Sequence, residues 1–432
     1  CDNTAPVGKA DREIQLRPGD DLRTIVADAP EGTRFVLTKG VYRQQRFAPK
    51  DRQEFVGMPG AVLNGAMVLV GWQQKGGHWV KEGLPAPLQR TGMCGKEDDP
   101  VDTDICTYRE DLFLDGRVYQ RVGELKDLGP GKWFYRDGTA FVSDDPSGRV
   151  AELSVTPNAI TSTANNVVLR NLNIEKYATA AQAGAIDARD TEGWQIIDVT
   201  AKWNHGLGIY IGRKMLVRGG SYSHNGQMGM GGAGNQSVVE GVEMAYNNYA
   251  GFMPTWEAGG AKFVFSNDLV IRNNCVHHNY GNGIWTDIDN INITIEGNKV
   301  FDNEGSGIMH EISYKATIRN NTVVRNGRNK HDWLWGSQIV VQNSQNVDVL
   351  GNVVEVAPDF GNGISLIYQN RGAGKYGAYL TANNNVSDNQ VILTGAKGKS
   401  GMVADFEGDR FWNQMGNKFH KNAYIAPANN GA

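Results

Sequence analysis

A short pattern repeats along the chain from about residue 160. The clearest copies cover residues 269–279 (LVIRNNCVHHN), 293–303 (ITIEGNKVFDN) and 316–326 (ATIRNNTVVRN). Each copy ends in an Asn, and this closing Asn recurs at positions 204, 225, 247, 279, 303 and 326, so that most steps are 21 to 24 residues. Self-similarity at a fixed period is the signature of a repeat architecture, and it constrains the fold more than any single residue does.

The length and composition of the repeat favour one architecture. The period is too short for a propeller blade, the residues are too often β-branched for helical repeats, and the framework of a leucine-rich repeat is missing. We therefore predict an all-β chain that forms a right-handed parallel β-helix, whose turns contribute about three short strands each and stack about 4.8 Å apart. Asn suits the turns because it tolerates left-handed backbone and its amides can stack as a ladder. The pattern resembles the pectate-lyase-like β-helix superfamily over roughly residues 155–430.

The N-terminal third departs from the repeat. Residues 1–13 are expected to form a polar tether. Residues 14–71 indicate a strand, a short helix from Asp21, another strand and the first turns, which cap the coil because an open end would expose its core. Residues 72–153 contain strand-like runs with Asp-Gly turns and are predicted to form an antiparallel β insertion. Residues 154–432 should then form the β-helix that carries the active-site groove.

The cysteines indicate an oxidising compartment. Cys1 precedes a polar stretch, as in a mature bacterial lipoprotein whose first Cys is lipidated, although a chain that merely starts at a Cys would look the same. Cys94 and Cys106 flank an acidic segment and could close a disulfide loop, which would persist in a periplasm or at a cell surface. We therefore expect a bacterial lipoprotein of the periplasm, outer membrane or cell surface that touches the membrane only through its N-terminal lipid.

Charge and hydropathy argue against other classes of partner. The 432 residues include 43 Lys and Arg against 47 Asp and Glu, and a net charge of −4 argues against a nucleic-acid-binding protein that relies on a basic patch. No apolar run approaches the ~20 residues of a membrane-spanning helix. No His and Cys spacing resembles a zinc site. We expect a monomer, because a β-helix is stable without a partner chain. We also expect that the protein needs no cofactor.

Two acidic residues interrupt the repeat at the same place in neighbouring turns. The second strand reads GIWTDID over 283–289 and GIMHEIS over 307–313, and alignment at the Gly-Ile pair places Asp287 opposite Glu311. Because alternate residues of a strand face opposite sides, Asp287 and Glu311 should project from one face together with Asp289. Other turns carry Gly or Ile at this point, so the acids are not part of the structural repeat.

A stacked acid pair suits retaining glycoside hydrolysis. Adjacent strands about 4.8 Å apart would hold the two carboxyl groups roughly 5 Å apart, as in a retaining rather than an inverting enzyme. One of the two pKa values should rise, since close acids cannot easily both ionise. We assign Asp287 as the nucleophile and Glu311 as the general acid/base. The alternatives are a solvated pair and two acids that share a cation.

Further polar and aromatic residues lie near this pair in the sequence. Glu257 is an alternative catalytic acid, and Lys262 could pair with it or hold substrate. Two Trp-bearing insertions bracket the acids and would suit sugar binding, because flat rings stack on pyranose faces; Trp333 and Trp335 could equally cover core. The candidate substrate-binding residues are Trp256, Lys262, Trp285, Asp289, His310, Trp333 and Trp335.

These motifs together carry a family resemblance. The segments GGAKF, GIWTDID and SGIMHEIS, within residues 256–326, resemble β-helix glycoside hydrolases of the β-xylosidase type. In that family an Asp after an aromatic strand start and a Glu one coil later are the nucleophile and the acid/base, which implies these roles for Asp287 and Glu311. The resemblance implies no particular sugar, because specificity resides in loops that differ.

Two other functions remain open. A polysaccharide lyase or uronate epimerase would use Lys262 as its base and Ca²⁺ to neutralise the uronate. The acids available to hold Ca²⁺ are Glu257, Asp287, Asp289 and Glu311. The absence of a basic stripe on these strands counts against this function. The third is a non-catalytic glycan-binding surface protein. In each case the partner is a polysaccharide or oligosaccharide.

Overall fold

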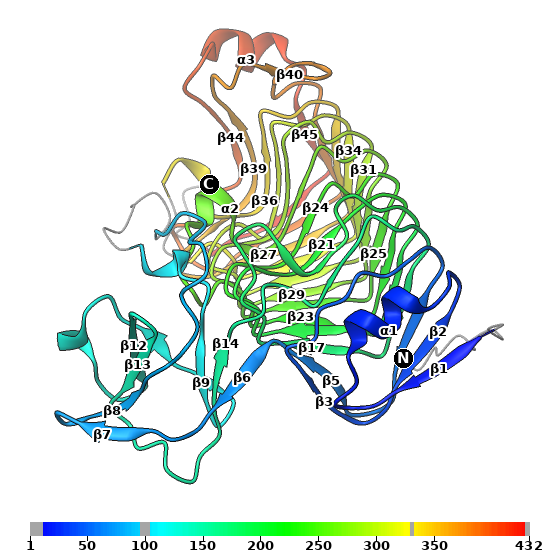
Figure 1. Cartoon of the computed structure of the whole chain (residues 1–432). Helices are drawn as coiled ribbons and strands as arrows, with labels where there is room; N and C mark the ends of the chain where they lie inside the picture. The colour runs from blue at the N-terminus through cyan, green and yellow to red at the C-terminus, as the bar shows by residue number, and fades with distance from the viewer. Residues whose placement is uncertain (1–11, 96–103, 329–331, 428–432) are drawn as a thin grey trace.

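The computed structural model describes residues 12–95, 104–328 and 332–427, and most of them form a coil of parallel strands (Figure 1). Within these residues the coil consists of three parallel sheets of 13, 12 and 10 strands, in which each strand pairs with the corresponding strand of the next turn. The predicted all-β, parallel β-helix architecture is therefore confirmed. We name the three sheets A, B and C in that order.

The strands of the three sheets follow one another around each turn. Sheet A consists of β1 (Glu13–Leu16), β2 (Arg34–Leu37), β4 (Glu54–Gly57), β16 (Val168–Arg170), β19 (Gln195–Ile197), β22 (Leu216–Arg218), β25 (Val238–Glu240), β28 (Val270–Arg272), β31 (Ile293–Glu296), β34 (Ala316–Arg319), β37 (Val347–Leu350), β42 (Asn385–Ser387) and β45 (Lys418–His420). Sheet B consists of β3 (Gly40–Arg43), β5 (Ala61–Asn64), β17 (Asn173–Glu175), β20 (Thr200–Lys202), β23 (Ser221–Ser223), β26 (Glu243–Ala245), β29 (Cys275–His277), β32 (Lys299–Phe301), β35 (Thr322–Val324), β38 (Val353–Val356), β43 (Gln390–Leu393) and β46 (Ala423–Ile425). Sheet C consists of β15 (Ile160–Thr161), β18 (Gly184–Asp187), β21 (Leu207–Ile211), β24 (Met228–Gly232), β27 (Gly259–Val264), β30 (Asn282–Asp287), β33 (Ile308–Glu311), β36 (Ser337–Gln342), β39 (Asn362–Tyr368) and β44 (Gly401–Ala404).

The interior of the coil is a stack of apolar side chains in register. In sheet C, Ile284 pairs with Ile308, Ile308 with Ile339, and Ile339 with Ile364, and all four side chains are fully buried. Because the side-chain period of a strand is two, the residues directly before and after each of these Ile residues along its own strand point outward. The acidic residues that interrupt the repeat, Asp287 and Glu311, therefore lie on the outer face of sheet C.

The recurring Asn residues form the predicted ladder of amides. The Nδ2 of Asn279 donates to the Oδ1 of Asn303 at 2.8 Å, and the Nδ2 of Asn303 donates to the Oδ1 of Asn326 at 2.8 Å. The left-handed backbone, however, belongs to the residue before each of these Asn residues, such as His278 (φ 53°) and Asp302 (φ 54°). These Asn residues are thus selected for their side-chain hydrogen bonds and not for their backbone tolerance.

The N-terminal cap has the predicted order of strand, helix and strand. The helix α1 (Leu22–Asp28) lies between β1 and β2, and the Oδ1 of Asp21 accepts a hydrogen bond from the backbone N–H of Arg23 at 3.1 Å. Such a cap satisfies amides that have no partner within the helix. Leu22 and Val26 are the buried face of α1.

The antiparallel insertion forms two small sheets beside the coil, at the lower left of Figure 1. It begins at β6, before the expected boundary at residue 72, because β6 pairs with the returning strand β14. One sheet consists of β6 (Ala66–Leu69), β9 (Leu112–Leu114), β10 (Arg117–Val118) and β14 (Ala151–Ser154). The other consists of β7 (Gln73–Lys75), β8 (His78–Lys81), β11 (Gln120–Arg121), β12 (Lys132–Arg136) and β13 (Thr139–Val142), and the short helices η1 (Ile105–Thr107) and η2 (Leu125–Asp127) lie in the connections.

The predicted disulfide joins the insertion to itself beside the coil. Cys94 and Cys106 are bonded, with a Cα–Cα distance of 5.6 Å, and Cys94 forms an antiparallel bridge with Phe252. The short helix α2 (Pro254–Glu257) begins two residues after Phe252. Cys1 and the rest of residues 1–11 lie outside the described residues.

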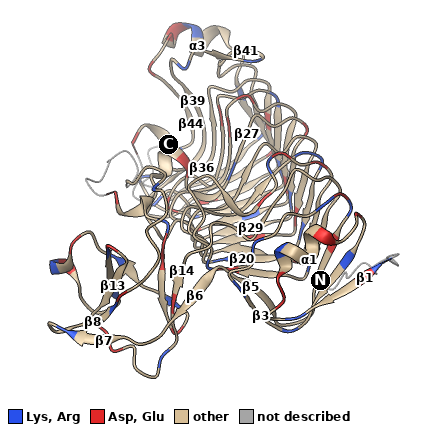
Figure 2. Ribbon diagram, viewed as in Figure 1, with Lys and Arg blue, Asp and Glu red and all other residues tan. Residues whose placement is uncertain are grey.

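Basic and acidic residues are interspersed along the turns of the coil (Figure 2). This distribution agrees with the near balance of 43 basic and 47 acidic residues. In the described part of the chain, no helix has the length and hydropathy needed to cross a membrane. At the C-terminal end, α3 (Gly408–Gln414) and the hairpin of β40 (Ala373–Gly374) and β41 (Gly377–Ala378) lie together at the top of Figure 1.

Candidate active site

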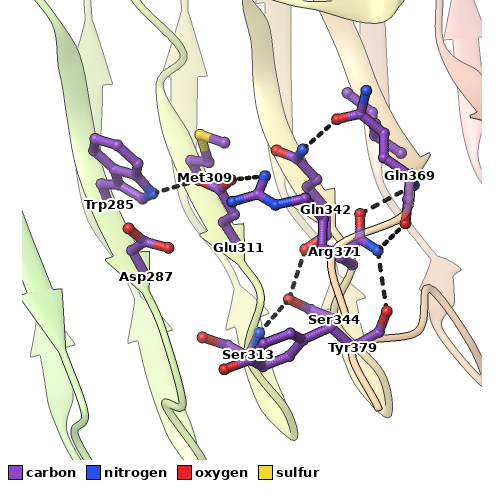
Figure 3. Close-up of polar contacts among 12 residues, drawn as sticks. Trp285, Asp287, Met309, Glu311, Ser313, Gln342, Ser344, Gln369, Arg371 and Tyr379 are labelled. Carbon is purple, nitrogen blue, oxygen red and sulfur yellow. Dashed lines mark hydrogen bonds and ion pairs between the residues drawn. The ribbon is translucent and has the colours of Figure 1, made fainter. Parts of the chain in front are cut away.

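Asp287 and Glu311 lie side by side on the outer face of sheet C. Asp287 is the last residue of β30, Glu311 is the last residue of β33, and the two are direct partners in the parallel pairing of these strands. The register predicted from the Gly-Ile alignment is therefore confirmed. Both residues are only 6% exposed, and Figure 3 shows their carboxyl groups on the same side of the sheet. Neighbouring strands in a sheet are about 4.8 Å apart, so the two side chains are close enough to act on the same sugar ring.

The two oxygens of Asp287 have different surroundings. Oδ2 lies 2.9 Å from the Nζ of Lys262, whose side chain also stands over the ring of Trp285 at 3.8 Å. Oδ1 is buried and has no hydrogen-bond partner among the described residues. A buried oxygen without a hydrogen-bond partner destabilises the folded state, so its presence calls for a functional explanation. Lys262 thus fixes one oxygen of Asp287, while the other oxygen is buried and forms no hydrogen bond with the described residues.

Glu311 is held by two donors. The Nη1 of Arg371 lies 2.6 Å from its Oε1, and the indole Nε1 of Trp285 donates to its Oε2 at 3.1 Å (Figure 3). Burial raises the pKa of Glu311, and the charge of Asp287 raises it further, while Arg371 and Lys262 oppose the rise. The surroundings of Glu311 thus favour its protonated form.

Glu257 lies behind this pair and not beside it. It ends α2, its Oε2 accepts a hydrogen bond from the Nε2 of Gln182 at 2.5 Å, and the same oxygen is 3.9 Å from the Nζ of Lys262. Burial raises the pKa of Glu257, and the nearby charge of Asp287 adds to the rise. Lys262 therefore stands between Glu257 and Asp287.

A cavity of about 280 Å³ opens over Glu311 and admits solvent to it. Its polar lining includes Glu311, Arg371, Gln342 and Gln369, whereas Asp287, Lys262 and Glu257 are not part of the lining. Asp287 lies on the strand next to Glu311. The Nε2 of Gln342 donates to the Oε1 of Gln369 at 2.8 Å, so that two rungs present their amides together (Figure 3).

An aromatic group packs on the outer face of sheet C beside the acids. Trp285 and Met309 are buried there, and Trp333 and Trp335 pack against them. Trp333 follows Asp332 in the short helix η3 (Asp332–Leu334), and the two indole rings have a centroid distance of 5.9 Å. Trp285 and Trp335 line the cavity, whereas Trp333 does not. The insertion that carries Trp333 and Trp335 thus covers apolar surface and also supplies part of the cavity wall.

Trp256 does not reach the cavity. Its side chain packs against the cluster formed by Cys106, Phe252 and Ala258 beside the disulfide. Its backbone carbonyl accepts a hydrogen bond from the Nζ of Lys262 at 2.9 Å. The prediction that the Trp256 ring contacts substrate is therefore not supported by the placement of that ring, although its carbonyl helps to hold Lys262.

His310 points into the core, and its assignment as a substrate-binding residue is wrong. It alternates with Glu311 along β33 and is fully buried. Its Nδ1 lies 2.8 Å from the Oγ1 of Thr286, and its Nε2 lies 2.7 Å from the carbonyl oxygen of Tyr314. The same alternation that turns Glu311 outward turns His310 inward.

Burial lowers the pKa of His310 from its ordinary value of 6.5 to about 4. Between these values the folded state binds fewer protons than the unfolded state. The stability that neutral His310 contributes to the folded state is therefore fully present above pH 6.5 and is lost as the pH falls towards 4. We expect this residue alone to reduce the free energy of unfolding by about 3 kcal/mol over that range. Denaturant unfolding of the wild type and His310→Gln should be compared across it. Equal pH slopes in the two proteins would contradict the prediction.

Asp289 also departs from its prediction. Ile288 and Asp289 have left-handed backbone, with φ of 61° and 56°, so that the alternation of β30 stops at Asp287. The Oδ1 of Asp289 accepts hydrogen bonds from the hydroxyl of Tyr379 at 2.7 Å and the backbone N–H of Lys375 at 2.9 Å. Asp289 therefore binds a segment of its own chain. No group of three or more His, Cys, Asp or Glu is placed to hold a metal ion anywhere in the described ranges.

Four residues of the site were missed from the sequence: Gln182, Gln342, Gln369 and Arg371. Arg371 is 60 residues from Glu311 along the chain and lies in a Gly-rich segment outside the repeat. Gln342 occupies the position of Glu311 in the next turn, and the repeat alignment could have identified it.

The comparisons with known proteins agree with this architecture. The model of the right-handed β-helix region matches residues 184–430, which is more than half of the 432 residues. The chain belongs to the right-handed β-helix family. A search with the whole sequence found no significant match among curated proteins.

Several solved structures are similar to this β-helix protein at low sequence identity. XylC in complex with xylose is 14% identical, with a TM-score of 0.67 over 91% of this chain and 86% of that one. A protein described as a glycoside hydrolase is 10% identical, with a TM-score of 0.48 over 96% of each chain. The A-module of the mannuronan C-5 epimerase AlgE4 from Azotobacter vinelandii is 11% identical, with a TM-score of 0.45 over 91% of each chain. At 14% identity the likeness to XylC shows the fold and no more.

Proposed function

We propose that this β-helix protein is a retaining glycoside hydrolase that acts on an oligosaccharide or polysaccharide. The observation that carries the proposal is the registered pair of Asp287 and Glu311, whose surroundings differ in the way that the reaction requires. Asp287 has a cation on one oxygen and, among the residues that the structure describes, no hydrogen-bond partner on the other. Glu311 has a raised pKa and lines the cavity. A nucleophile and a proton donor are thus adjacent.

The reaction follows in two steps. The Oδ1 of Asp287 attacks the anomeric carbon, the bond from that carbon to the leaving oxygen breaks, and the proton of Glu311 passes to that oxygen. The product is a glycosyl ester on Asp287 and an ionised Glu311. In the second step Glu311 takes a proton from water, whose oxygen attacks the anomeric carbon and releases Asp287 as a carboxylate. Two inversions leave the sugar with its original configuration.

The spacing of the pair supports retention. Retaining enzymes hold their two carboxyl groups about 5–5.5 Å apart, and inverting enzymes hold them about 6.5–9.5 Å apart so that a water fits between. Neighbouring strands at about 4.8 Å suit the first arrangement. Asp287 and Glu311 are partners on adjacent strands, with no strand between them.

The remaining cavity wall is suited to a sugar. Trp285 and Trp335 offer ring surfaces, while Gln342 and Gln369 offer amides that can bind hydroxyl groups. XylC was solved with xylose, so xylosides are the first substrates to test on this chain. The Cys94–Cys106 disulfide supports a further part of the proposal, namely that the protein works in an oxidising compartment such as a periplasm or at a cell surface.

The lyase and epimerase alternative has weaker support. It needs Lys262 as a free base, yet Lys262 contacts Asp287, Glu257 and the carbonyl of Trp256. It also groups Asp289 with the other acids as Ca²⁺ ligands, whereas Asp289 binds Tyr379 and Lys375. The residues present therefore do not fit a Ca²⁺ site.

Product analysis on a panel of xylosides and other plant and bacterial glycans tests the proposal. We expect a new reducing end, no ultraviolet-absorbing double bond, and an initial product that has the anomeric configuration of the substrate. An unsaturated product would favour a lyase instead. Glycan binding that is unchanged in Asp287→Asn, without turnover in the wild type, would favour a non-catalytic binding protein.

A further inference from the structure

The chain leaves the coil after β39 and returns over the active site. Residues 369–379, which we call the hairpin segment, include β40 and β41 as an antiparallel pair. Arg371 stands near the start of this segment and places its Nη1 2.6 Å from the Oε1 of Glu311. The Arg371 side chain is 35% exposed, whereas that of Glu311 is 7% exposed. A largely solvent-facing segment thus supplies a cation to a buried carboxylate.

Asp289 binds the far side of the same segment. Its Oδ1 accepts both the backbone N–H of Lys375, at 2.9 Å, and the hydroxyl of Tyr379, at 2.7 Å. The contact is close, because a Cβ added at Gly374 would overlap the Asp289 carboxylate and the Tyr379 hydroxyl. The left-handed φ of 56° at Asp289 directs this side chain to the hairpin segment rather than to the sugar cavity.

Two other residues of the coil support the segment. The hydroxyl of Tyr314 donates to the carbonyl of Gly377 at 2.8 Å and accepts from the N–H of Tyr376 at 3.3 Å. The Nδ2 of Asn343 donates to the carbonyl of Gln369 at 2.6 Å. Arg371 therefore lies between a base held by Asn343 and a tip held by Asp289 and Tyr314. Of these residues, only Asp289 offers a carboxylate to the hairpin.

We propose that Asp289 is a positioning residue, which acts through the hairpin segment to hold Arg371 against Glu311. The inference deepens the proposed function, since it gives Asp289 a role toward the acid/base of the same site. It replaces the predicted role of Asp289 in sugar binding with an indirect one. Loss of Asp289 should release the segment and withdraw the guanidinium from Glu311.

The electrostatic consequence follows from the groups that face Glu311. Asp287 on β30 raises its pKa, and Arg371 on the hairpin segment and Lys262 on β27 lower it. The uncharged partner on β36 is Gln342. Withdrawal of Arg371 removes the positive charge that contacts Glu311 directly, so that Glu311 should hold its proton to higher pH.

The titration of Glu311 can be measured without any substrate. Trp285 donates its indole N–H to Glu311, so the pH dependence of that N–H signal in ¹H–¹⁵N spectra reports the ionisation of Glu311. The signal is assigned with Trp285→Phe, and Glu311→Gln should abolish the titration. We expect Arg371→Met to raise the midpoint, and Asp289→Ala to raise it at least half as far. Asp289→Asn keeps an oxygen acceptor and should restore most of the wild-type midpoint.

The outcomes separate this inference from the proposed function. An unchanged midpoint in Asp289→Ala overturns the inference, and so does an unchanged midpoint in Arg371→Met. If Asp289→Ala does not fold, Tyr379→Phe removes one of the two Asp289 bonds and should raise the midpoint by a smaller amount; no rise there also overturns the inference. A protein without glycosidase activity that shows the expected titration shifts would overturn the proposed function alone.

Discussion

Replacing Asp287 with Asn is expected to reduce turnover by at least about 10³-fold, because the amide cannot form the glycosyl ester. The fold should persist, since Asp287 lies on the outer face of sheet C and Asn keeps its shape. The measurement is kcat on an aryl glycoside of the preferred sugar, together with thermal unfolding of both proteins.

A matched control lies on another sheet. Asp348 is an outward residue of β37 whose Oδ1 accepts a hydrogen bond from Asn385 at 3.1 Å, and Asp348→Asn should keep wild-type turnover. A fluorinated glycoside should leave a covalent sugar on the peptide that contains Asp287 in the wild type and not in the variant. Turnover close to wild type in Asp287→Asn would eliminate Asp287 as the nucleophile.

Replacing Glu311 with Gln is expected to reduce turnover by about 10²–10⁴-fold, because the amide neither gives a proton to the leaving oxygen nor takes one from water. The alkaline limb of the pH profile should disappear, since the raised pKa of Glu311 sets the pH at which the proton donor is lost. The first step should survive best on substrates with an acidic leaving group, which needs no proton.

Glu296 provides the matched control for this variant. It pairs with Arg319 at 2.6 Å, as Glu311 pairs with Arg371 at 2.6 Å, but it lies on β31 in sheet A. Glu296→Gln should keep both turnover and the alkaline limb. A pH profile of Glu311→Gln that retains this limb would assign the proton donor to another residue, and Glu257, whose pKa is also raised, would be the next to test.

The fold and the acid pair could be predicted from the sequence because both depend on local periodicity. A step of about one turn and a side-chain period of two are sufficient to place Asp287 beside Glu311. The disulfide between Cys94 and Cys106 could be predicted for a different reason, because the two residues flank a short loop. Each of these predictions uses residues whose relation is fixed by the repeat or by a short loop.

The errors arise where periodicity ends. Asp289 was placed by extending the alternation beyond β30, but two left-handed residues end that strand at Asp287. His310 was grouped with the pair because it is adjacent in sequence, although alternation alone turns it inward. Arg371 could not be found by any local rule, since the hairpin segment that carries it returns from two strands further along sheet C.

The contact between Lys262 and one oxygen of Asp287 also bears on the release of the sugar. If Oδ1 forms the ester, Oδ2 becomes the ester carbonyl, and it lies 2.9 Å from the Lys262 ammonium in the free protein. A positive charge at that distance stabilises the negative charge that returns to Asp287 as the ester bond breaks. Lys262 would then make Asp287 a better leaving group and so assist the hydrolysis of the intermediate as well as hold the nucleophile in place.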